Sequence, residues 1–426
     1  MALRNPAGGR CPAHPDVIVV GAGPAGATAA RTLALGGAKV RLLDRCRFPR
    51  HKACGGAISM RALGRFPHLR AVLPRISTRL ISRLHLEAPA GGKITLESPE
   101  PAALMIRRIE FDHVLVQLAQ DAGAELIEGV EISQASSTRD EVQLSTRDGR
   151  IVRAPIVVAA DGVNSVVARR LGFNRGWPVS SLALDMMEET PVDALRCSDP
   201  DALWVSYGHS GAQGYAYVFP KLDHVNVGIG YLLSFYRAQV RHSPGELQQQ
   251  LVSTLCRRGV LVGRSQSARC TGALIPVGGP LKETARGRVL LAGDAGGFVN
   301  GCYAEGIYYA MVSGDLAAKA ILAGRPGRYP RAWQREIGAE LRDSVLVQRY
   351  LFRDTRRIDR MVQGARIYPD LAQRLIQYAA GQLPYERARR RLAVRLPLLA
   401  ARVVLAAFGF GMPIVGNALR LEDGDA

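Results

Sequence analysis

The sequence is poor in lysine, and its cysteines form no recognisable pattern. Only six of its 56 basic residues are lysines, so arginine spread along the chain carries most of the formal charge of +19. Binding to an anionic partner would explain such an excess of positive charge, and so would a genome-wide bias toward arginine. The seven cysteines are odd in number and lack C-x-x-C pairs. This argues against a disulfide framework or a metal site and predicts reduced thiols.

No apolar run precedes the first predicted strand, so we expect no export signal and a cytoplasmic location. Near the other end, residues 396–416 are about long enough to span a bilayer. Arg402 and two prolines weaken that segment as a spanning helix. We therefore expect it to close a substrate tunnel, to rest peripherally on the inner face of an anionic membrane, or to pack internally.

A dinucleotide-binding unit is predicted near the start of the chain. Residues 16–20 form a Val/Ile-rich run bounded by glycine, which is typical of a buried strand. Gly21, Gly23 and Gly26 then give G-x-G-x-x-G ahead of an alanine-rich helix. Asp44 ends the next strand eighteen residues past Gly26, where an acid would accept hydrogen bonds from a ribose hydroxyl. The motif alone does not decide between FAD and a nicotinamide cofactor.

The string FPRHKACGGAIS, residues 48–59, indicates which cofactor to expect. It resembles the P-R-x-K-x-C-G-G-x-x-S signature of the geranylgeranyl reductase family, within the p-hydroxybenzoate hydroxylase-like flavoprotein superfamily. The resemblance implies FAD and the saturation of isoprenoid double bonds. Gly55 and Gly56 would let the backbone lie against a flat ring system, with the Cys54 thiol beside it as the candidate catalytic group. The alternative is a small buried thiol in a glycine turn.

Three further strings resemble FAD-contacting motifs of the same superfamily. They are an R-x-x-F-D helix start, a D-G turn after a buried strand, and RVLLAGDAGG followed by E-G-I. In the last motif the aspartate would bind the ribityl chain, and the following helix end would face the pyrophosphate or the ring. The cofactor-binding residues implied are Gly21, Gly23, Ala25, Gly26, Asp44, Arg45, Lys52, Arg108, Asp161, Gly293, Asp294, Gly306 and Ile307.

A candidate substrate-binding strand follows. The string YAYVFPK, residues 215–221, resembles the family's Y-x-W-x-F-P-K strand, with Tyr217 where the family usually has tryptophan. Alternate residues of a strand share a face, so Tyr215, Tyr217 and Phe219 would form one wall, ended by Pro220. An aromatic wall suits an apolar chain because it buries area without requiring hydrogen bonds. The alternative is that these rings are ordinary core.

The predicted fold class is α/β, with a discontinuous Rossmann-like FAD-binding domain, an inserted antiparallel sheet domain and a C-terminal helical region. The discontinuity follows because the first and third FAD motifs lie about 270 residues apart, with sheet-like sequence between them. The FAD domain is assigned residues 1–73, 101–172 and 271–325, the substrate domain 74–100 and 173–270, and the helical region 326–426.

The function predicted is an FAD-dependent reductase in which reduced flavin gives hydride to an isoprenoid double bond and an acid supplies the proton. An isoprenoid lipid, quinone or pigment would be the substrate. The sequence has no second G-x-G-x-x-G, so the electrons would come from transiently docked NADPH or from an external reduced ferredoxin. One alternative is a flavin monooxygenase or halogenase on the same scaffold. Another is a basic protein with a residual nucleotide fold that binds nucleic acid or membrane, although we favour no nucleic-acid partner.

Overall fold

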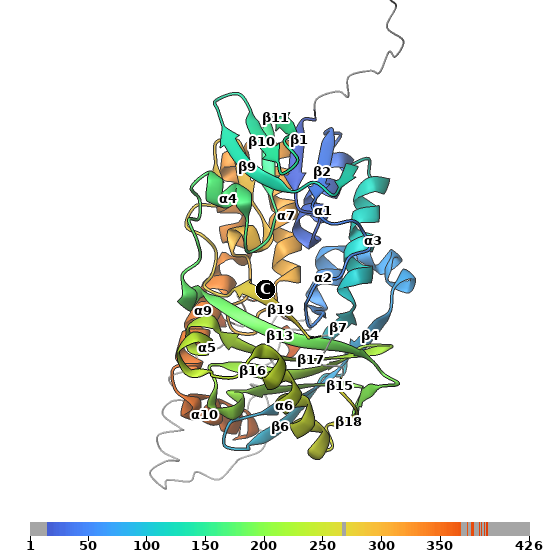
Figure 1. Cartoon of the computed structure of the whole chain (residues 1–426), viewed down its shortest axis with the longest axis vertical. Helices are drawn as coiled ribbons and strands as arrows, with labels where there is room; N and C mark the ends of the chain where they lie inside the picture. The colour runs from blue at the N-terminus through green and yellow to red at the C-terminus, as the bar shows by residue number, and fades with distance from the viewer. Residues whose placement is uncertain are drawn as a thin grey trace, which may run out of the picture.

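The structure is a computed structural model that describes residues 15–265 and 270–367, together with 373, 376–378, 383, 385, 387, 389 and 390. It contains a mostly parallel six-stranded sheet and a mostly antiparallel seven-stranded sheet at different levels of an elongated molecule (Figure 1). The chain passes repeatedly between the two levels, so each sheet is assembled from segments that are far apart in the sequence. The predicted α/β fold class is confirmed.

The six-stranded sheet has the order β20-β21-β12-β1-β2-β8 and belongs to the upper unit in Figure 1. Its strands are parallel, except that β20 pairs antiparallel with β21. Every residue of β1 is buried, as its Val/Ile composition predicts for a strand covered on both faces. The strands are β1 (Val17–Val20), β2 (Val40–Asp44), β8 (Glu125–Glu128), β12 (Ile156–Ala159), β20 (Ala285–Arg286) and β21 (Val289–Leu291).

Helices cover one face of this sheet and a small sheet covers the other. Val17 and Val19 pack among the helices α1, α3 and α7, whereas Ile18 and Val20 pack against strands β9 and β10 and helix α4. This alternation is the period-two geometry of a strand. The covering elements are α1 (Pro24–Leu35), α3 (Arg108–Asp121), α7 (Ile307–Leu322), α4 (Val166–Arg170), β9 (Ile132–Ser137), β10 (Val142–Thr146) and β11 (Ile151–Ala154).

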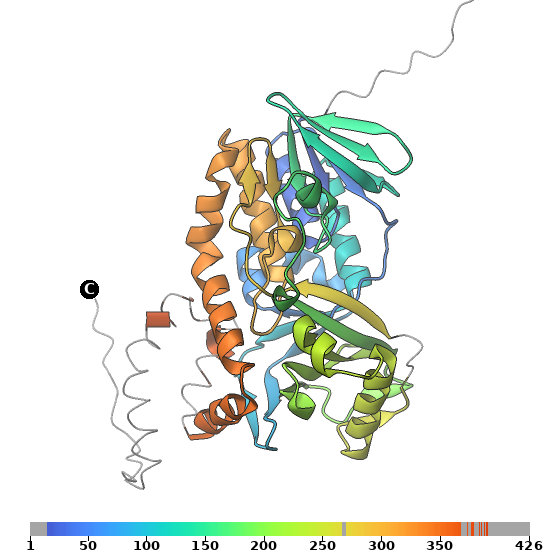
Figure 2. The same cartoon turned by 60° about the vertical axis from the view of Figure 1, so that its left-hand side comes forward.

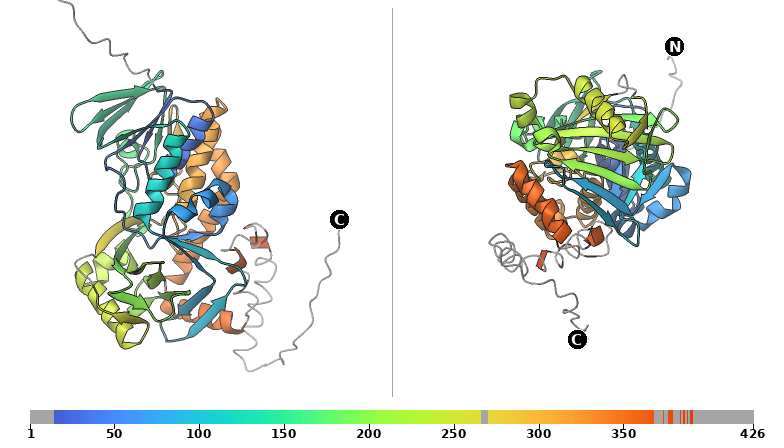
Figure 3. Two further views of the ribbon diagram at one scale, coloured as in Figure 1. Left: turned by 90° about the vertical axis from the view of Figure 1, so that its right-hand side faces the viewer. Right: turned by 90° about the horizontal axis from the view of Figure 1, so that it is seen from below.

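The seven-stranded sheet has the order β19-β13-β17-β16-β15-β5-β6 and lies at the opposite end of the molecule from β9–β11 (Figure 3). All its pairs are antiparallel except β5 with β15. The strands are β5 (Arg83–Glu87), β6 (Lys93–Glu97), β13 (Leu182–Pro191), β15 (Ala202–Tyr207), β16 (Gly214–Pro220), β17 (His224–Leu232) and β19 (Thr271–Pro276). One face packs on α5 (Leu233–Gln239) and α6 (Pro244–Arg257), so the other face is left for the cofactor unit.

Smaller elements connect the two units. Strands β3, β7 and β4 form one sheet, although the domain limits above assign β4 to a different unit from β3 and β7. Those limits stay a prediction. The connecting elements are β3 (Ala57–Ser59), α2 (Arg61–Arg65), β4 (Thr78–Ile81) and β7 (Ala103–Ile106). Strands β14 (Leu195–Cys197) and β18 (Leu261–Gly263) pair with each other beside the seven-stranded sheet.

A continuous helical rod runs along the side of the molecule, from the level of the six-stranded sheet to that of the seven-stranded sheet (Figure 2). It comprises α8 (Tyr329–Trp333), a π-helical turn (Gln334–Gly338) and α9 (Ala339–Leu351), and α10 (Thr355–Ile367) follows it. Within the described residues, no helix is both long and apolar enough to cross a bilayer. The apolar segment at residues 396–416 lies outside the described residues.

Candidate active site

The glycine loop after β1 has no room for a side chain at Gly21 or Gly26. Gly21 has a positive φ of +95°, and a Cβ atom on Gly26 would lie 1.8 Å from the Gly21 carbonyl oxygen. Gly23 is the N-cap of α1, whose first-turn amides have no partner within the helix. Ala25 meets the third predicted motif, because a Cβ on Gly293 would lie 2.9 Å from the Ala25 methyl group. The loop therefore fits a dinucleotide phosphate at the start of α1.

Asp44 lies at the end of β2 beside this loop and is 8% exposed. One carboxylate oxygen accepts the Ala22 amide at 2.7 Å, and the other accepts the Cys46 amide at 2.8 Å. These bonds hold the carboxylate in place while leaving lone pairs for a ribose hydroxyl. The neighbouring Arg45 is exposed.

Asp294 lies in the 3₁₀ turn after β21. No donor from the described residues is recorded on its carboxylate, and burial raises its pKa, while the charges of Lys52 and Arg108 act in the opposite direction. The Cβ position of Gly306 is 3.6 Å from Asp294 Oδ1, and Ile307 begins α7 directly after it. A partly buried carboxylate with no protein donor fits the ribityl hydroxyls of FAD. Lys52 itself is exposed.

Asp161 has partners within its own turn. Its carboxylate accepts the Ser165 hydroxyl at 2.5 Å and the Val166 amide at 2.8 Å, and Ser165 in turn caps helix α4. Burial raises the Asp161 pKa, and these hydrogen bonds oppose the rise. Asp161 therefore orders the turn after β12; a direct contact with the cofactor stays a prediction.

An ion cluster that the sequence did not reveal lies beside the glycine loop. Asp112 is fully buried and accepts two hydrogen bonds of 2.7 Å from the Arg108 guanidinium. It also lies 3.1 Å from an Arg50 guanidinium nitrogen, which is 3.7 Å from the Cβ position of Gly23. Two arginines therefore share one carboxylate, which leaves positive charge beside the predicted pyrophosphate position. Arg50 lies inside the P-R-x-K string but was not singled out there.

The C-G-G loop, residues 54–56, packs directly on the predicted substrate strand. A Cβ on Gly55 would lie 2.9 Å from the Phe219 ring and 3.5 Å from the Tyr217 ring. The Cys54 thiol accepts the Gly56 amide at 3.4 Å, and the Cys54 carbonyl accepts the Asn226 side-chain amide at 3.3 Å. The two strings that carry the family resemblance therefore meet, although they are more than 150 residues apart.

The aromatic wall is a continuous row of rings. Ring centroids are 4.4 Å apart between Phe219 and Tyr217, 6.0 Å between Tyr217 and Tyr215, and 5.2 Å between Tyr215 and Tyr207. Phe352, just after α9, continues the row at 6.1 Å from Tyr207. Pro220 ends β16 beyond Phe219 and is buried. The row joins the C-G-G loop to the end of the helical rod.

Two adjoining pockets lie along this row. The inner one, with a cavity volume of about 30 Å³, is lined by Asp185, Tyr215 and Cys302 among others. The outer one, with a cavity volume of about 300 Å³, includes Arg349 and Arg353 in its lining. The residues that both pockets share are Gln213, Leu232, Gln348 and Phe352. The shared lining makes a path from an arginine-bearing surface to the aromatic rings.

Asp185, on β13, is a buried acid at the inner end of this path. The Tyr217 hydroxyl donates to both of its carboxylate oxygens, at 3.2 and 3.3 Å. Burial raises the Asp185 pKa to about 7, although the Tyr217 hydrogen bond and the charge of Lys52 lower it. Sequence analysis missed this residue; a charged residue within the apolar run LALDMM was the available signal.

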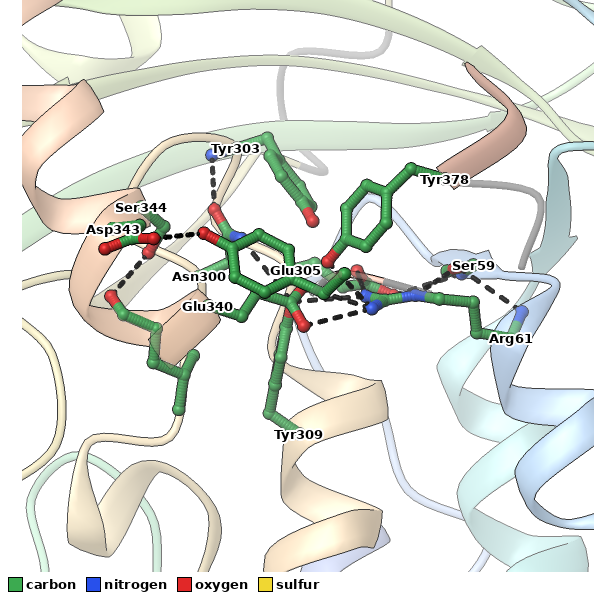
Figure 4. A network of polar contacts seen from close by, with 12 residues as sticks. Ser59, Arg61, Asn300, Tyr303, Glu305, Tyr309, Glu340, Asp343, Ser344 and Tyr378 are labelled. Carbon is green, nitrogen blue, oxygen red and sulfur yellow. Dashed lines mark hydrogen bonds and ion pairs between the residues drawn. The ribbon is translucent and has the colours of Figure 1, made fainter. Parts of the chain in front are cut away.

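A buried polar network joins the cofactor unit to the helical rod (Figure 4). The Arg61 guanidinium donates to both carboxylate oxygens of Glu340, at 3.0 and 3.1 Å, and to the Tyr378 hydroxyl at 2.8 Å. It also lies 3.6 Å from Glu305, which accepts the Ser59 amide at 3.1 Å. Glu305 precedes Gly306, so the network fixes the start of α7. Among the described residues, no cluster of metal-ligating side chains is present.

Comparison with known proteins places these features in a wider group. A family model described as an FAD binding domain matches residues 14–312. The chain is 31% identical over 323 residues to the geranylgeranyl diphosphate reductase, chloroplastic, of Oryza sativa subsp. japonica, a match that covers 72% of this chain and 66% of that protein. It is also 31% identical over 339 residues to the menaquinone reductase of Mycolicibacterium smegmatis, covering 75% and 79%.

Solved structures share the fold. A geranylgeranyl bacteriochlorophyll reductase-like protein from Thermoplasma acidophilum superposes with a TM-score of 0.72 at 22% identity, covering 89% of this chain and 98% of that one. The flavin-dependent brominase Bmp2 superposes with a TM-score of 0.68 at 16% identity, covering 90% and 98%. At these identities the likeness concerns the fold alone.

Proposed function

This chain belongs to the geranylgeranyl reductase family of FAD-dependent oxidoreductases, and from that membership we propose that it saturates carbon–carbon double bonds of an isoprenoid chain. The observation that carries the proposal is the packing of Gly55 on Phe219 and Tyr217. It puts the row of aromatic rings directly against the loop that bears the family signature. An isoprenoid chain matches such a path because it offers apolar area and asks for few hydrogen bonds.

The residues that would hold FAD come from three parts of the chain. The glycine loop and the Arg50–Asp112–Arg108 cluster would meet the pyrophosphate, Asp44 the ribose, and Asp294 the ribityl chain. Bound and reduced, FAD supplies the hydride. The protein's own task is to hold an unactivated alkene close to that position and to exclude water, which the aromatic wall supports.

The substrate class follows from the same path. By their names, relatives act on geranylgeranyl diphosphate and on menaquinone, and both carry an isoprenoid chain. We propose an isoprenoid lipid, quinone or pigment as the substrate. The test is expression in a host that accumulates unsaturated geranylgeranyl compounds, followed by mass spectrometry. We expect products that are heavier by increments of two hydrogens; flavin-loaded protein that saturates none of these compounds would contradict the proposal.

A monooxygenase or halogenase is the rival reading, because such enzymes share this fold. The C-G-G loop and the aromatic strand favour the reductase. Anaerobic turnover separates the two, since reduction of an alkene needs no oxygen, whereas hydroxylation and halogenation do. Activity that appears only with oxygen, without alkene saturation, would establish the rival.

We propose that the electrons arrive from outside the chain, from NADPH docking transiently or from a reduced ferredoxin. The basis is that the sequence holds one G-x-G-x-x-G unit. Stopped-flow mixing with NADPH discriminates between these donors. If NADPH bleaches the flavin absorbance at least as fast as the enzyme turns over, NADPH is the donor. If NADPH causes no bleaching and reduced ferredoxin does, ferredoxin is the donor.

We also propose a peripheral contact with the inner face of a membrane, in a cytoplasmic protein. The formal charge of +19 and Arg349 and Arg353 at the outer pocket support it. Flotation with anionic vesicles at low salt, lost at high salt and lost with neutral vesicles, is the expected result. Equal recovery with both vesicle types would contradict it.

A further inference from the structure

We propose that Asp185 is the proton donor for the alkene, held and oriented by the Tyr217 hydroxyl. The inference rests on the proposed reductase function and adds a residue to it. It starts from the one departure in the aromatic strand, where Tyr217 occupies a position at which the family usually has tryptophan. Tyrosine brings to this position a hydroxyl group, and the hydroxyl group reaches Asp185.

The backbone around the pair is built to bring these side chains together. β13 and β16 are not neighbours; β17 lies between them in the sheet. Gly228 of β17 clears the space for the tyrosine, because a Cβ there would lie 2.3 Å from the Tyr217 hydroxyl; Gly230 lies next to Asp185, with its Cβ position 3.7 Å from Oδ1. Within the VGIG sequence of β17, the missing side chain at Gly228 therefore lets the Tyr217 ring lie against the strand backbone.

The pair lies between the cofactor-facing loop and the substrate path. The Tyr217 ring approaches Gly55 of the C-G-G loop on one side, and Asp185 lines the inner pocket on the other. Asp185 is 7% exposed and Tyr217 is 2% exposed, so bulk water has little access to either group. A carboxyl group in this position touches whatever occupies the inner pocket.

Burial raises the Asp185 pKa from the ordinary value of 3.8 to about 7, so the protonated and ionised forms are both populated near neutral pH. A general acid is most effective when its pKa lies near the working pH. The titratable groups that face Asp185 are Tyr217 and Tyr215 from β16, Lys52 from the loop before Cys54, and Cys270 before β19. Lys52 and the Tyr217 hydroxyl favour the carboxylate, which limits the rise.

The chemical step is balanced with reduced flavin as the named reductant. The alkene π bond breaks, one carbon receives hydride and the other forms a C–H bond with the proton that leaves the Asp185 carboxyl oxygen. The alkene is reduced, the flavin is oxidised, and Asp185 remains as a carboxylate. A proton from water then restores the acid before the next double bond is reduced.

The first test is the pH dependence of turnover. The donor must be protonated, so the wild-type kcat falls as pH rises through about 7. Asp185→Asn keeps the shape of the side chain and can accept a hydrogen bond from the Tyr217 hydroxyl, but it has no acidic proton to give. We expect kcat to fall by about 100-fold or more and to lose its decrease above about pH 7, the alkaline limb of the pH profile. Tyr217→Phe and the family-like Tyr217→Trp remove a hydrogen bond that favours the carboxylate, so both should move the limb to higher pH.

The second test needs no bound cofactor. The folded-state pKa of Asp185 is above its unfolded value, so its contribution to stability is present at low pH and is lost as pH rises from about 4 to about 7. The urea midpoint of the wild type should therefore fall relative to Asp185→Asn across this window. Tyr217→Phe should carry the fall to higher pH.

Glu188→Gln is the matched control. Glu188 is a buried acid on the same strand, but it accepts the hydroxyls of Thr190 and Ser265 and does not line the inner pocket. The Glu188→Gln variant should keep the decrease in kcat above about pH 7. An active wild type whose Asp185→Asn variant keeps both rate and limb, at full FAD occupancy, overturns the proton-donor role alone. A flavin-loaded wild type that saturates no isoprenoid overturns the proposed function, and the proton-donor role falls with it.

Discussion

Cys54 and Asp185 both lie near Tyr217, whose ring packs on Gly55 and whose hydroxyl donates to Asp185. The Cys54 thiol is engaged with the Gly56 amide and lies beside Arg108, whereas Asp185 opens onto the inner pocket. This arrangement favours a positioning role for Cys54, which keeps the C-G-G loop in shape against the ring wall.

At the residue scale, we expect Cys54→Ala to lower the reduction rate while FAD occupancy stays full. Cys54→Ser keeps an acceptor for the Gly56 amide and should retain more activity. The rate is followed by the reoxidation of the flavin under anaerobic conditions with substrate. Cys256→Ala is the control, because Cys256 lies on α6 behind the sheet. Unchanged rates in Cys54→Ala would remove the thiol from both positioning and proton donation.

At the scale of elements, the turn between β1 and α1 depends on close contact between backbones. The Gly26 Cβ position falls 1.8 Å from the Gly21 carbonyl oxygen, so a methyl group there must displace the loop or the helix. The displacement would affect the N-terminal amides of α1, which are the groups proposed to meet the phosphates. We therefore expect a methyl group at this position to weaken cofactor binding more than it lowers the stability of the fold.

We accordingly expect Gly26→Ala to yield a folded protein with most of its flavin lost. The ratio of flavin absorbance to protein absorbance in the purified protein measures FAD occupancy, and circular dichroism measures folding. Gly245→Ala is the control, because Gly245 lies in the first turn of α6 with no atom within 4 Å of its Cβ position. The control should keep its flavin. Full occupancy in Gly26→Ala would show that the loop binds no phosphate.

At the scale of the whole molecule, the Arg61 network fastens the helical rod to the cofactor unit. The side chains of Arg61, Glu305 and Glu340 are 12%, 8% and 6% exposed. Removal of the cation would leave two buried carboxylates facing each other without compensation. The connection therefore contributes to global stability far more than a surface ion pair does.

We expect Arg61→Met to lower the free energy of unfolding by about 3–5 kcal/mol, the usual cost of breaking a buried ion pair. Urea denaturation of the flavin-loaded protein measures it. Glu131→Gln, which breaks the exposed pair with Arg147, is the control and should cost about 0–1 kcal/mol. Equal losses in the two variants would contradict a stabilising role for the network.

The α/β class and the one-sided aromatic strand follow from local patterns, namely the glycine spacing and the period of two. Asp185 and Arg61 do not. Tyr217 is 32 residues from Asp185 and Glu340 is 279 from Arg61, so their pairing depends on which strands and helices become neighbours. The roles predicted for Cys54 and for the residues proposed to hold FAD stay predictions, because local patterns identify the loops and not the bound group.

The order of strands in the six-stranded sheet has a consequence for synthesis. β12 lies between β1 and β21, and β21 is made some 130 residues after β12. Until β21 leaves the ribosome, one edge of β12 has unpaired backbone N–H and C=O groups, and the Asp294 turn has not yet been synthesised. The open edge of β12, which invites aggregation, therefore persists while five of the seven strands of the other sheet are made, namely β13, β15, β16, β17 and β19. Flavin uptake should mark the moment when that edge closes.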